Sequence, residues 1–431
     1  MYNYIRIGAK VISGLKIPKY KEMSMKHKLN VYSKPKYVYI PLISSNDENI
    51  TVLVNIGDYV FKGSQIGRRK GNFKTPIFSS VSGSVIGFEK RTISSGKSVK
   101  CVVIENDFKE KIEKGFKQVK KLNNITKEEF VETIENCGIV GLGGAGFPTY
   151  VKYSTHQKIH TLIVNAVECE PYITADYFII KEKCEEILEM IDAILEINNI
   201  DNCIIAIKTT NKSLMTIFNK YIGTYLKIKV VLVPNIYPMG WERKLIKEVT
   251  GITYEKIPSE KGIIVNNVST IYAMYQALKL NKPMIERIVT FSGFGLKKPQ
   301  NVLVKVGTPV DEVINYIGGS YKTKKLVMIA GGPMMGTKVD DLVITPEVNS
   351  VLIMEDDFEC DVQECLRCGK CINVCPANIC PVLIKDNIDD TSALKSMNVD
   401  KCISCGLCSY ICPAKINVRE YVSIAKEKVG K

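Results

Sequence analysis

The chain has 431 residues, 45% hydrophobic and 24% charged, which is enough for two to four globular domains with a buried core. Its formal net charge of +14 would suit nucleic acid, an anionic membrane surface or an acidic partner. No nucleic-acid fold signature is present, however. The sequence has no run of 18 apolar residues, which argues against a membrane-spanning helix, and its three histidines argue against a histidine-built metal site.

The first part of the chain divides into a basic arm and an all-β domain. Residues 1–36 are basic and lack periodicity, and their composition fits either an arm wrapped on the body or a solvated tail. Residues 37–110 carry short β-branched runs between glycine and serine turns, which predicts an all-β domain. Its phrases Val54–Gly67 and Ile77–Val85 resemble the hairpins of the biotinyl/lipoyl-type barrel-sandwich hybrid fold, without the context of a modified lysine. We therefore expect a docking module, followed by a lysine-rich link.

Between residues 125 and 283 the pattern alternates strands with helices. Thr126 and Glu129 have the spacing of a capping box, which predicts a helix that ends near Gly138. Strands follow at about 161–165, 203–207 and 228–233, and helices at about 177–197, 211–221 and 240–250. This order predicts a Rossmann-like domain with a mostly parallel sheet and helices on both faces.

A glycine loop opens this domain's candidate site. Five glycines between Gly138 and Gly146 form a loop whose backbone N–H groups can cradle a phosphate, with Lys152 one helical turn beyond. It is not a Walker A loop, because no Gly-Lys-Ser/Thr follows. Glycine-rich turns also serve close packing, and the spacing alone leaves both interpretations open.

An acidic turn, Val164–Tyr172, lies at the carboxyl end of a predicted strand, where α/β sheets place ligands. Its carboxylates can accept hydrogen bonds from a flavin ring or a ribose, although a solvated turn has the same composition. Tyr237–Glu242 and Ile264–Thr270 are two further polar segments. Taken singly, each could be a turn or a helix cap.

Two copies of one cysteine run lie near the carboxyl end. They read Cys365, Cys368, Cys371, Cys375 before Pro376, and Cys402, Cys405, Cys408, Cys412 before Pro413. This C-x2-C-x2-C-x3-C-P spacing is typical of two-cluster bacterial ferredoxins, in which the fourth cysteine ligates the other cubane. The expected ligand sets of the two 4Fe-4S clusters are therefore Cys365, Cys368, Cys371 and Cys412, and Cys402, Cys405, Cys408 and Cys375. Zinc would not need the paired spacing, and disulfides would imply secretion, for which we see no signal peptide.

The remaining segments frame these cysteines. Residues 284–340 return to short β-runs and glycine turns, which predicts a small α+β module. The domain of the cysteine runs is expected over 355–420, with a short basic helix over 414–431. The other seven cysteines are scattered in mostly apolar surroundings, which favours buried free thiols in a reduced, intracellular protein.

Together the motifs of the central domain resemble those of the FMN- and NADH-binding subunit of respiratory complex I. The matching segments are Gly143–Thr149 with Lys152, Asn165–Pro171, Tyr237–Glu242 and Val265–Thr270. Two residues depart from that pattern, since Leu142 stands in place of an arginine and Val167 in place of an aspartate. The complex I subunit also holds one cluster in its last domain, whereas this chain has two cysteine runs.

A closer resemblance, over about residues 5–420, is to the RnfC family of the Rnf electron-transport complex. That family has the same glycine loop and the acidic motif Asn-x-x-Glu-Cys-Glu-Pro-Tyr. The implied fold is a multidomain α/β protein with a barrel-sandwich hybrid, a central FMN/NADH domain, a β-grasp module of the SLBB type and a two-cluster ferredoxin-like helical domain. The histidine that the family carries in the arm is missing from Gly14–Pro18.

The resemblance implies non-covalent FMN on the glycine loop, with NAD(H) stacked on the flavin ring. The implied FMN-binding residues are Gly141, Gly143, Gly144, Ala145, Gly146, Phe147, Lys152, Asn165, Glu168, Asn266 and Asn267. Glu170 and Glu242, with Phe147, would lie near the nicotinamide and its ribose and are the expected catalytic residues. Hydride would pass between nicotinamide and flavin, and single electrons would pass on to the clusters, with no side chain acting as a general acid or base.

The implied function is that of the NAD(H)-reacting subunit of a membrane-bound ferredoxin:NAD oxidoreductase that translocates Na⁺ or H⁺. Its partners would be the other subunits, NAD(H) and, indirectly, ferredoxin, with no nucleic acid, at the cytoplasmic surface of the cell membrane as a peripheral subunit. One alternative is a soluble cobalamin reductase of a bacterial microcompartment, a family whose chain usually begins near the glycine loop. Another is a non-enzymatic iron–sulfur electron relay with a flavin site that is not functional. Residues 1–110 argue against the first, and the intact glycine loop argues against the second.

Overall fold

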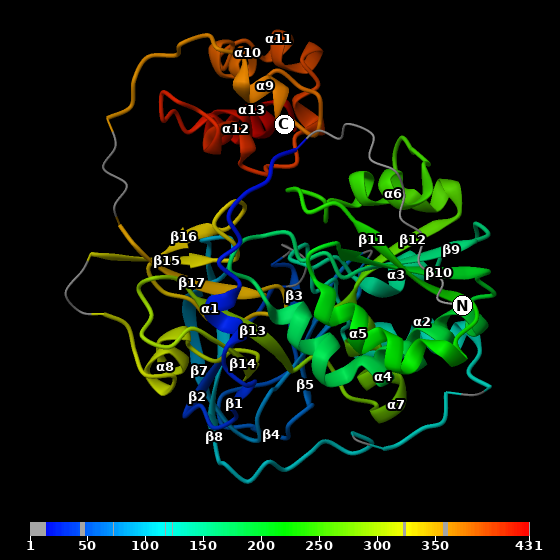
Figure 1. Cartoon of the computed structure of the whole chain (residues 1–431). Coiled ribbons are helices and arrows are strands. Elements are labelled where there is room, and N and C mark those ends of the chain that lie inside the picture. The colour runs from blue at the N-terminus through cyan, green and yellow to red at the C-terminus, as the bar shows by residue number, and fades with distance from the viewer. Residues whose placement is uncertain are drawn as a thin grey trace.

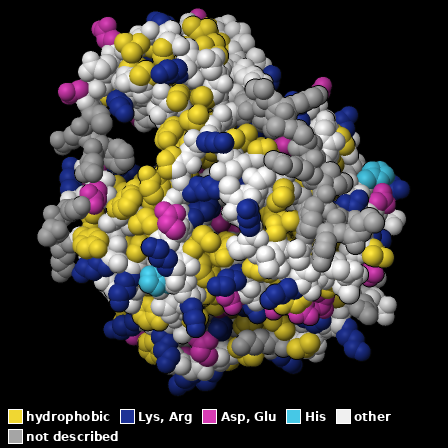
Figure 2. Space-filling model, viewed as in Figure 1, with side chains coloured by type: hydrophobic (Ala, Val, Ile, Leu, Met, Phe, Trp, Pro, Cys, Tyr) yellow, Lys and Arg dark blue, Asp and Glu magenta, His cyan; other side chains and the backbone are white. Residues whose placement is uncertain are grey.

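The computed structural model describes residues 14–43, 48–71, 73–116, 118–122, 124–321, 325–356 and 361–430. Within the described residues, a body that contains four β-sheets carries a small helical domain, residues 361–430, at one end (Figure 1). We call this the cysteine domain. Lysine and arginine side chains are scattered over the visible face rather than gathered in one patch (Figure 2). Of the helices within these residues, none has the length and apolar character needed to cross a membrane.

The amino-terminal β domain contains two facing sheets. One has the order β2 (Tyr37–Pro41), β8 (Ser98–Asn106), β7 (Gly83–Thr92), β4 (Tyr59–Val60), and the other β3 (Ile50–Val52), β5 (Gln65–Arg69), β6 (Pro76–Phe78). The alternating burial along β2 leaves Val38 and Ile40 in a core that is shared with Ile66 of the second sheet. Two-residue periodicity in the sequence therefore becomes one buried face on each sheet.

The central domain has one sheet of four parallel strands. Their order is β11 (Ile228–Val233), β10 (Asn202–Lys208), β9 (Thr161–Asn165), β12 (Ile263–Asn267). The helices are α2 (Lys127–Asn136), α3 (Thr149–Tyr153), α4 (Ala175–Ile197), α5 (Lys212–Tyr221), α6 (Glu242–Thr250) and α7 (Val268–Leu280). On β9, Leu162 and Val164 face the core of α4 and α7, whereas Ile163 faces Leu245 of α6. Helices thus cover both faces, as the pattern predicted.

The capping box and the strand pattern are present, and some elements were missed. Thr126 Oγ1 accepts from the Glu129 amide at 3.2 Å, and the Glu129 carboxylate accepts from the Thr126 amide at 2.9 Å. Strand β12 and helix α7 were not among the expected elements. The sequence Ile-Ile-Val-Asn-Asn shows no alternation, because β12 is buried on both faces like other parallel strands.

The six-stranded sheet is mixed and includes a strand from the arm. Its order is β1 (Asn30–Tyr32), β14 (Gln300–Lys305), β13 (Glu286–Ser292), β17 (Ser350–Glu355), β15 (Leu326–Ala330), β16 (Thr337–Val339), with α8 (Val310–Tyr316) packed on it. Strand β1 pairs in parallel with β14. From residue 14 onward the arm is therefore wrapped on the body and is not a solvated tail. Residues 1–13 lie outside the described part of the chain.

The cysteine domain is built from short helices. They are α9 (Lys370–Asn373), α10 (Pro381–Asp386), α11 (Thr391–Ser396), α12 (Leu407–Tyr410) and α13 (Val418–Gly430). Its own apolar core includes Ile384, Leu394 and Val422. The arm runs from beside the cysteine domain down to α1 (Glu22–Met25) (Figure 1). Its Leu15 and Ile17 pack against a cluster that contains Cys405 and Leu407.

Candidate functional site

Parallel strands bring the polar segments of the central domain to one edge. Asn165 ends β9 and is in register with Asn267, which ends β12. The Asn267 side chain caps α7 by accepting from the Ser269 amide at 2.9 Å. The glycine loop joins the same edge, since the Leu142 amide donates to Thr270 Oγ1 at 2.9 Å. The candidate residues therefore converge because the strands that carry them point the same way.

The glycine loop exposes its backbone at the middle and packs closely at its end. Gly143, Gly144 and Ala145 are exposed. Gly144 has φ +108°, and a Cβ there would meet nothing within 4 Å. At Gly146, with φ +61°, a Cβ would lie 2.7 Å from Glu347 Cγ. An exposed backbone with free space beside it is what the approach of a phosphate needs.

A buried arginine that no sequence motif indicates lies beneath this loop. Arg287 of β13 is 5% exposed and donates to the carbonyl oxygens of Leu142, at 3.4 Å, and Pro346. Burial lowers its pKa to about 10, which leaves it charged at neutral pH, with Asp176 and Glu347 as its acidic neighbours. Arg287 thus places positive charge next to the glycine loop, at Leu142.

Several expected ligands of the flavin are engaged with protein groups. Lys152 Nζ donates to the Val265 carbonyl at 2.7 Å and lies 3.9 Å from Glu242 Oε2, and burial lowers its pKa. Asn165 Nδ2 donates to the Gly240 carbonyl at 2.9 Å. Asn266 donates to the Tyr153 hydroxyl, Glu242 Oε1 accepts from the Tyr254 hydroxyl, and Phe147 is 37% exposed with its ring against Phe73. These contacts order the rim of the site.

The first acid of the turn, Glu168, faces the arm. Its Oε2 lies 3.2 Å from Lys21 Nζ, and its Oε1 accepts from the Asp176 amide at 2.8 Å. Asn267 Nδ2 donates to Asp176 at 2.7 Å, so Asp176 links the acidic turn to α7. Burial raises the pKa of Glu168 to about 7 despite Lys21. Neither Lys21 nor Asp176 stands out in the sequence, because both are ordinary surface residue types in unremarkable segments.

The second acid, Glu170, points toward the cysteine domain. Its Oε1 lies 3.2 Å from the Tyr237 hydroxyl and its Oε2 accepts from the Met334 amide at 3.1 Å. Tyr237, which is 1% exposed, also donates to the carbonyl oxygen of Cys405 at 2.8 Å. Burial raises the pKa of Glu170 to about 7. One acid of the turn is therefore tied to the arm, and the other, through Tyr237, to a cysteine loop.

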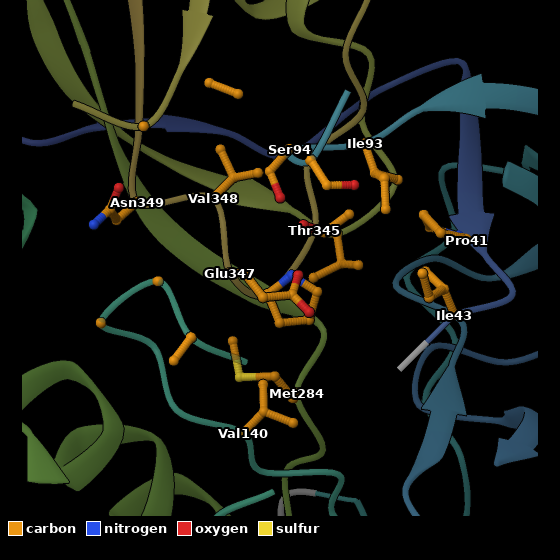
Figure 3. Close-up of a pocket in the computed structure, with 18 of the residues that line it drawn as sticks. Pro41, Ile43, Ile93, Ser94, Val140, Met284, Thr345, Glu347, Val348 and Asn349 are labelled. Carbon is orange, nitrogen blue, oxygen red and sulfur yellow. The ribbon is translucent and has the colours of Figure 1, made fainter. Parts of the chain in front are cut away.

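A cavity of about 470 Å³ lies between the glycine loop, the acidic turn, the amino-terminal β domain and the six-stranded sheet. Met284 and Val140 lie on one side, Pro41 and Ile43 on the other, and Glu347 reaches between them (Figure 3). Of the expected site residues, those that line the cavity are Gly143, Gly144, Ala145 and Glu170. The buried hydroxyls of Thr75 and Thr345, also in its lining, have no partner among the described residues.

This cavity has the size and the chemistry of a cofactor pocket. Apolar walls with a few convergent polar groups are typical of such sites, and the volume falls in their range. The exposed Gly143–Ala145 backbone at its edge fits a phosphate-bearing group. The other expected residues are not in its lining, namely Gly141, Gly146, Phe147, Lys152, Asn165, Glu168, Glu242, Asn266 and Asn267. The expected constellation therefore has two parts, one at the cavity and one that supports it.

The two cysteine runs fold alike and form two separate pockets. One small cavity is lined by Cys365, Cys368, Cys371 and Cys412, and another by Cys375, Cys402, Cys405 and Cys408. Equivalent positions take the same positive φ in both runs, at 52° for Arg367 and Ser404 and at 71° and 77° for Gly369 and Gly406. The Ser404 amide donates to Cys402 Sγ at 3.3 Å.

The thiol arrangement fits a cluster better than a single ion. Within the described ranges, no three His, Cys, Asp or Glu side chains approach closely enough to hold one metal ion. Four thiols around a shared space, with a backbone N–H to sulfur, match the requirements of a cubane rather than those of a zinc knuckle. Of the seven other cysteines, Cys101, Cys137, Cys184 and Cys203 are buried free thiols.

Comparison with known proteins gives the family. A family model described as the RnfC barrel sandwich hybrid domain matches residues 9–109, one described as the Nuo51 FMN-binding domain matches 134–276, and one described as a 4Fe-4S dicluster domain matches 358–413. The C subunit of the Na⁺-translocating ferredoxin:NAD⁺ oxidoreductase complex of Acetobacterium woodii is 31% identical over 381 residues, which is 86% of each chain. The chain belongs to the RnfC family.

Other members of the RnfC family are similarly related. The proton-translocating counterpart of Clostridium ljungdahlii is 31% identical, covering 81% of this chain and 78% of its own. The C subunit of the ion-translocating oxidoreductase complex of Rhodobacter capsulatus is 31% identical, covering 84% and 72%. A solved NAD⁺-reducing NiFe-hydrogenase aligns with a TM-score of 0.50 at 15% identity, over 72% of this chain and 64% of that chain, which is a likeness of fold.

Proposed function

We propose that this chain is the peripheral NAD(H)- and FMN-binding subunit of an ion-translocating ferredoxin:NAD oxidoreductase. Membership of the RnfC family and the matches to an FMN-binding and a 4Fe-4S dicluster domain support this proposal. The observation that carries it is the contact chain from Glu170 through Tyr237 to Cys405. It joins the turn expected at the nicotinamide to a loop expected to hold a cluster.

The proposed domains follow the sheets. They are the arm (1–36), the barrel-sandwich hybrid (37–110), a Rossmann-like FMN/NADH domain (125–283), a β-grasp module of the SLBB type (284–340) and a ferredoxin-like domain (355–420). Four parallel strands support the Rossmann-like assignment, and a mixed sheet with one packed helix supports the β-grasp assignment. The mixed sheet continues past residue 340 through β17.

The residues of the cavity have distinct proposed roles. FMN, when bound, supplies hydride acceptance and one-electron release, and the clusters supply an electron relay. The backbone of Gly143–Ala145 binds the phosphate end, with the charge of Arg287 behind the loop. Glu170 stands at the cavity, where it orients the nicotinamide or its ribose by a hydrogen bond.

The remaining expected residues act around this centre. Phe147 offers an exposed ring beside the loop for stacking, Lys152 adds positive charge for the FMN phosphate, and Glu242, 3.9 Å from Lys152, serves the nicotinamide and its ribose. Asn165 and Asn266 fix the sheet edge. The further members of the proposed site are Gly141, Gly146, Glu168 and Asn267, which hold the loop and the turn together.

The relay runs through the cysteine domain to partners outside this chain. The cluster proposed for Cys402, Cys405, Cys408 and Cys375 lies next to Tyr237 and the acidic turn, so it accepts electrons first. The cluster proposed for Cys365, Cys368, Cys371 and Cys412 is the outer one, and Cys368 is exposed. The proposed partners are the other subunits, and ferredoxin indirectly, at the cytoplasmic surface of the membrane.

Two variants of the anaerobic holoprotein, followed in stopped flow, test this proposal. Glu170→Gln should keep FMN and iron but slow flavin reduction by NADH, because a lost charged hydrogen bond is worth about 1.5–3 kcal/mol, or roughly tenfold to a hundredfold. Cys402→Ala should leave flavin reduction by NADH intact and stop transfer to an added acceptor. Cys380→Ala, a free thiol in the same domain, is the control. If Cys402→Ala blocked flavin reduction with FMN still bound, the order flavin then cluster would be wrong.

A further inference from the structure

Four separate segments meet at Tyr237. An apolar cluster contains Tyr237, Met334, Cys405 and Leu407, and Leu15 and Ile17 of the arm pack against it. The central domain, the six-stranded sheet, the cysteine domain and the arm each contribute to it. This junction lies directly between the acidic turn and the Cys402–Cys408 loop.

Tyr237 is held from two sides. On its backbone side, the Leu15 amide donates to the Tyr237 carbonyl at 3.0 Å and the Tyr237 amide donates to the Leu15 carbonyl at 2.8 Å. On its side-chain side, the hydroxyl donates to the Cys405 carbonyl at 2.8 Å and lies 3.2 Å from Glu170. A fully buried ring with both ends engaged has one position available.

Close packing keeps the cysteine loop at the junction. A Cβ on Gly406 would lie 2.5 Å from the Met334 carbonyl oxygen, so the loop approaches at backbone distance. Arg419 of α13 donates to the carbonyl oxygens of Met334 and Met335, at 3.0 Å each. The rate of electron transfer falls steeply with the distance between donor and acceptor. Contacts that fix the position of the Cys402–Cys408 loop therefore also set this rate.

We propose that Tyr237 is a positioning residue for electron transfer between the flavin site and the cluster of the Cys402–Cys408 loop, and that the arm holds it in place through Leu15. The inference rests on the proposed function. Tyr237 is not among the residues that line the cavity, and it acts through Glu170 and Cys405. It fixes the position of the Cys405 peptide relative to Glu170. Its hydrogen bond to the Cys405 carbonyl alters the environment of the cluster proposed for Cys375, Cys402, Cys405 and Cys408, and not that of the other cluster.

Tyr237→Phe in the anaerobic holoprotein tests the hydroxyl. We expect FMN and iron to be retained, flavin reduction by NADH to proceed, and the later appearance of reduced cluster to slow by about tenfold, the factor for one lost hydrogen bond. We call the cluster proposed for Cys375, Cys402, Cys405 and Cys408 the inner cluster. Its paramagnetic resonance signal should shift while that of the outer cluster stays unchanged, because hydrogen bonds around the cysteines tune the electronic properties of a cluster. A Cys365→Ala protein, which should keep the inner cluster alone, identifies its signal beforehand.

Gly14→Val tests the arm. Gly14 has φ +129°, and a Cβ there would lie 2.5 Å from the Tyr237 carbonyl oxygen, so the substitution breaks the Leu15 pairing and leaves the hydroxyl in place. In Gly14→Val, electron transfer from the flavin to the cluster should slow as in Tyr237→Phe. Tyr221→Phe, on α5 and 38% exposed, is the matched control and should behave as wild type.

Each outcome decides one statement. Wild-type flavin-to-cluster kinetics in Tyr237→Phe, or equal shifts in both cluster signals, would overturn the role of Tyr237. Loss of FMN from Tyr237→Phe would assign Tyr237 to flavin binding instead. Wild-type kinetics in Gly14→Val alone would overturn the role of the arm. If NADH failed to reduce the flavin of the unmodified protein, the proposed function itself would fail.

Discussion

Lys21 Nζ lies 3.2 Å from Glu168 Oε2, and the two side chains are 10% and 7% exposed, so an ion pair is buried between the arm and the acidic turn. Lys21 also donates to the carbonyl oxygens of Glu168, at 2.9 Å, and Ile173. A buried pair of this kind adds little net stability, but removal of one partner destabilises the protein because it leaves the other charge buried without compensation. The acidic turn therefore depends on a segment 147 residues earlier in the chain.

Removing the side-chain charge of Lys21 should destabilise the protein. Lys21→Met leaves the Glu168 carboxyl group buried without its cation, and a broken buried pair costs up to about 3–5 kcal/mol at a pH above about 7, where the carboxyl group is ionised. Anaerobic scanning calorimetry should show a lower Tm than for Lys26→Met, an exposed lysine of the same arm. Addition of Glu168→Gln should recover most of the loss. Equal Tm values for the two lysine variants would show that the pair is not coupled to folding.

The cysteine pairing predicts which variants lose the same cluster. Unmodified protein should contain about eight iron and eight labile sulfide, and Cys365→Ala and Cys412→Ala should each contain about four. Both should lose the same paramagnetic resonance signal, whereas Cys375→Ala and Cys405→Ala should lose the other. Iron and sulfide assays on anaerobic protein give the count. If Cys412→Ala lost the signal that is missing in Cys405→Ala, the fourth cysteine would serve its own run.

The glycine loop predicts a selective loss of flavin. Gly144→Val introduces a β-branched residue at φ +108° and fills the space that a phosphate would approach, so FMN binding should be abolished. Gly57→Val is a matched control, since Gly57 also has a positive φ, +96°, and no atoms within 4 Å of its Cβ position. Flavin released on denaturation should be FMN, present in the control and missing from Gly144→Val. Normal FMN in Gly144→Val would refute the placement.

The raised pKa of Glu170 predicts a pH-dependent stability difference. Burial raises the pKa to about 7, above the unfolded value of about 4.3, so the folded state keeps the proton longer. The stabilisation is fully present below about pH 4.3 and is lost as pH rises through about 7. Glu170→Gln does not titrate. The free energy of unfolding of Glu170→Gln should therefore rise relative to that of wild type between about pH 5 and 7, by up to about 1.4 kcal/mol per pH unit. The difference, followed as Tm, should level off above about pH 7.

A control separates Glu170 from other acids in that experiment. Glu132→Gln changes an exposed carboxylate on α2, which meets water in the folded and unfolded chain alike. Its Tm difference from wild type should stay flat over the same pH range. A flat difference for Glu170→Gln as well would mean that Glu170 is ionised throughout.

The sequence by itself determined the features whose physics is local. The spacing of Cys365 to Cys375 and its repeat indicated the two metal pockets, because three thiols within seven residues can face one cluster only in that arrangement. The Thr126 capping box and the strand at β9 were likewise predictable from neighbouring residues. Strand β12 was not, because a strand buried on both faces loses its alternation.

Only the tertiary structure decided how these parts face one another. Tyr237 meets Cys405 across 168 residues, and Lys21 meets Glu168 across 147. Such pairs arise from the docking of domains, and nothing in the local sequence of Tyr237 or Lys21 records it, since tyrosine and lysine occur in many solvated turns and arms. The choice of which cluster lies nearest the acidic turn, and the use of the arm to hold that junction, follow from burial of apolar surface between segments that are distant in sequence.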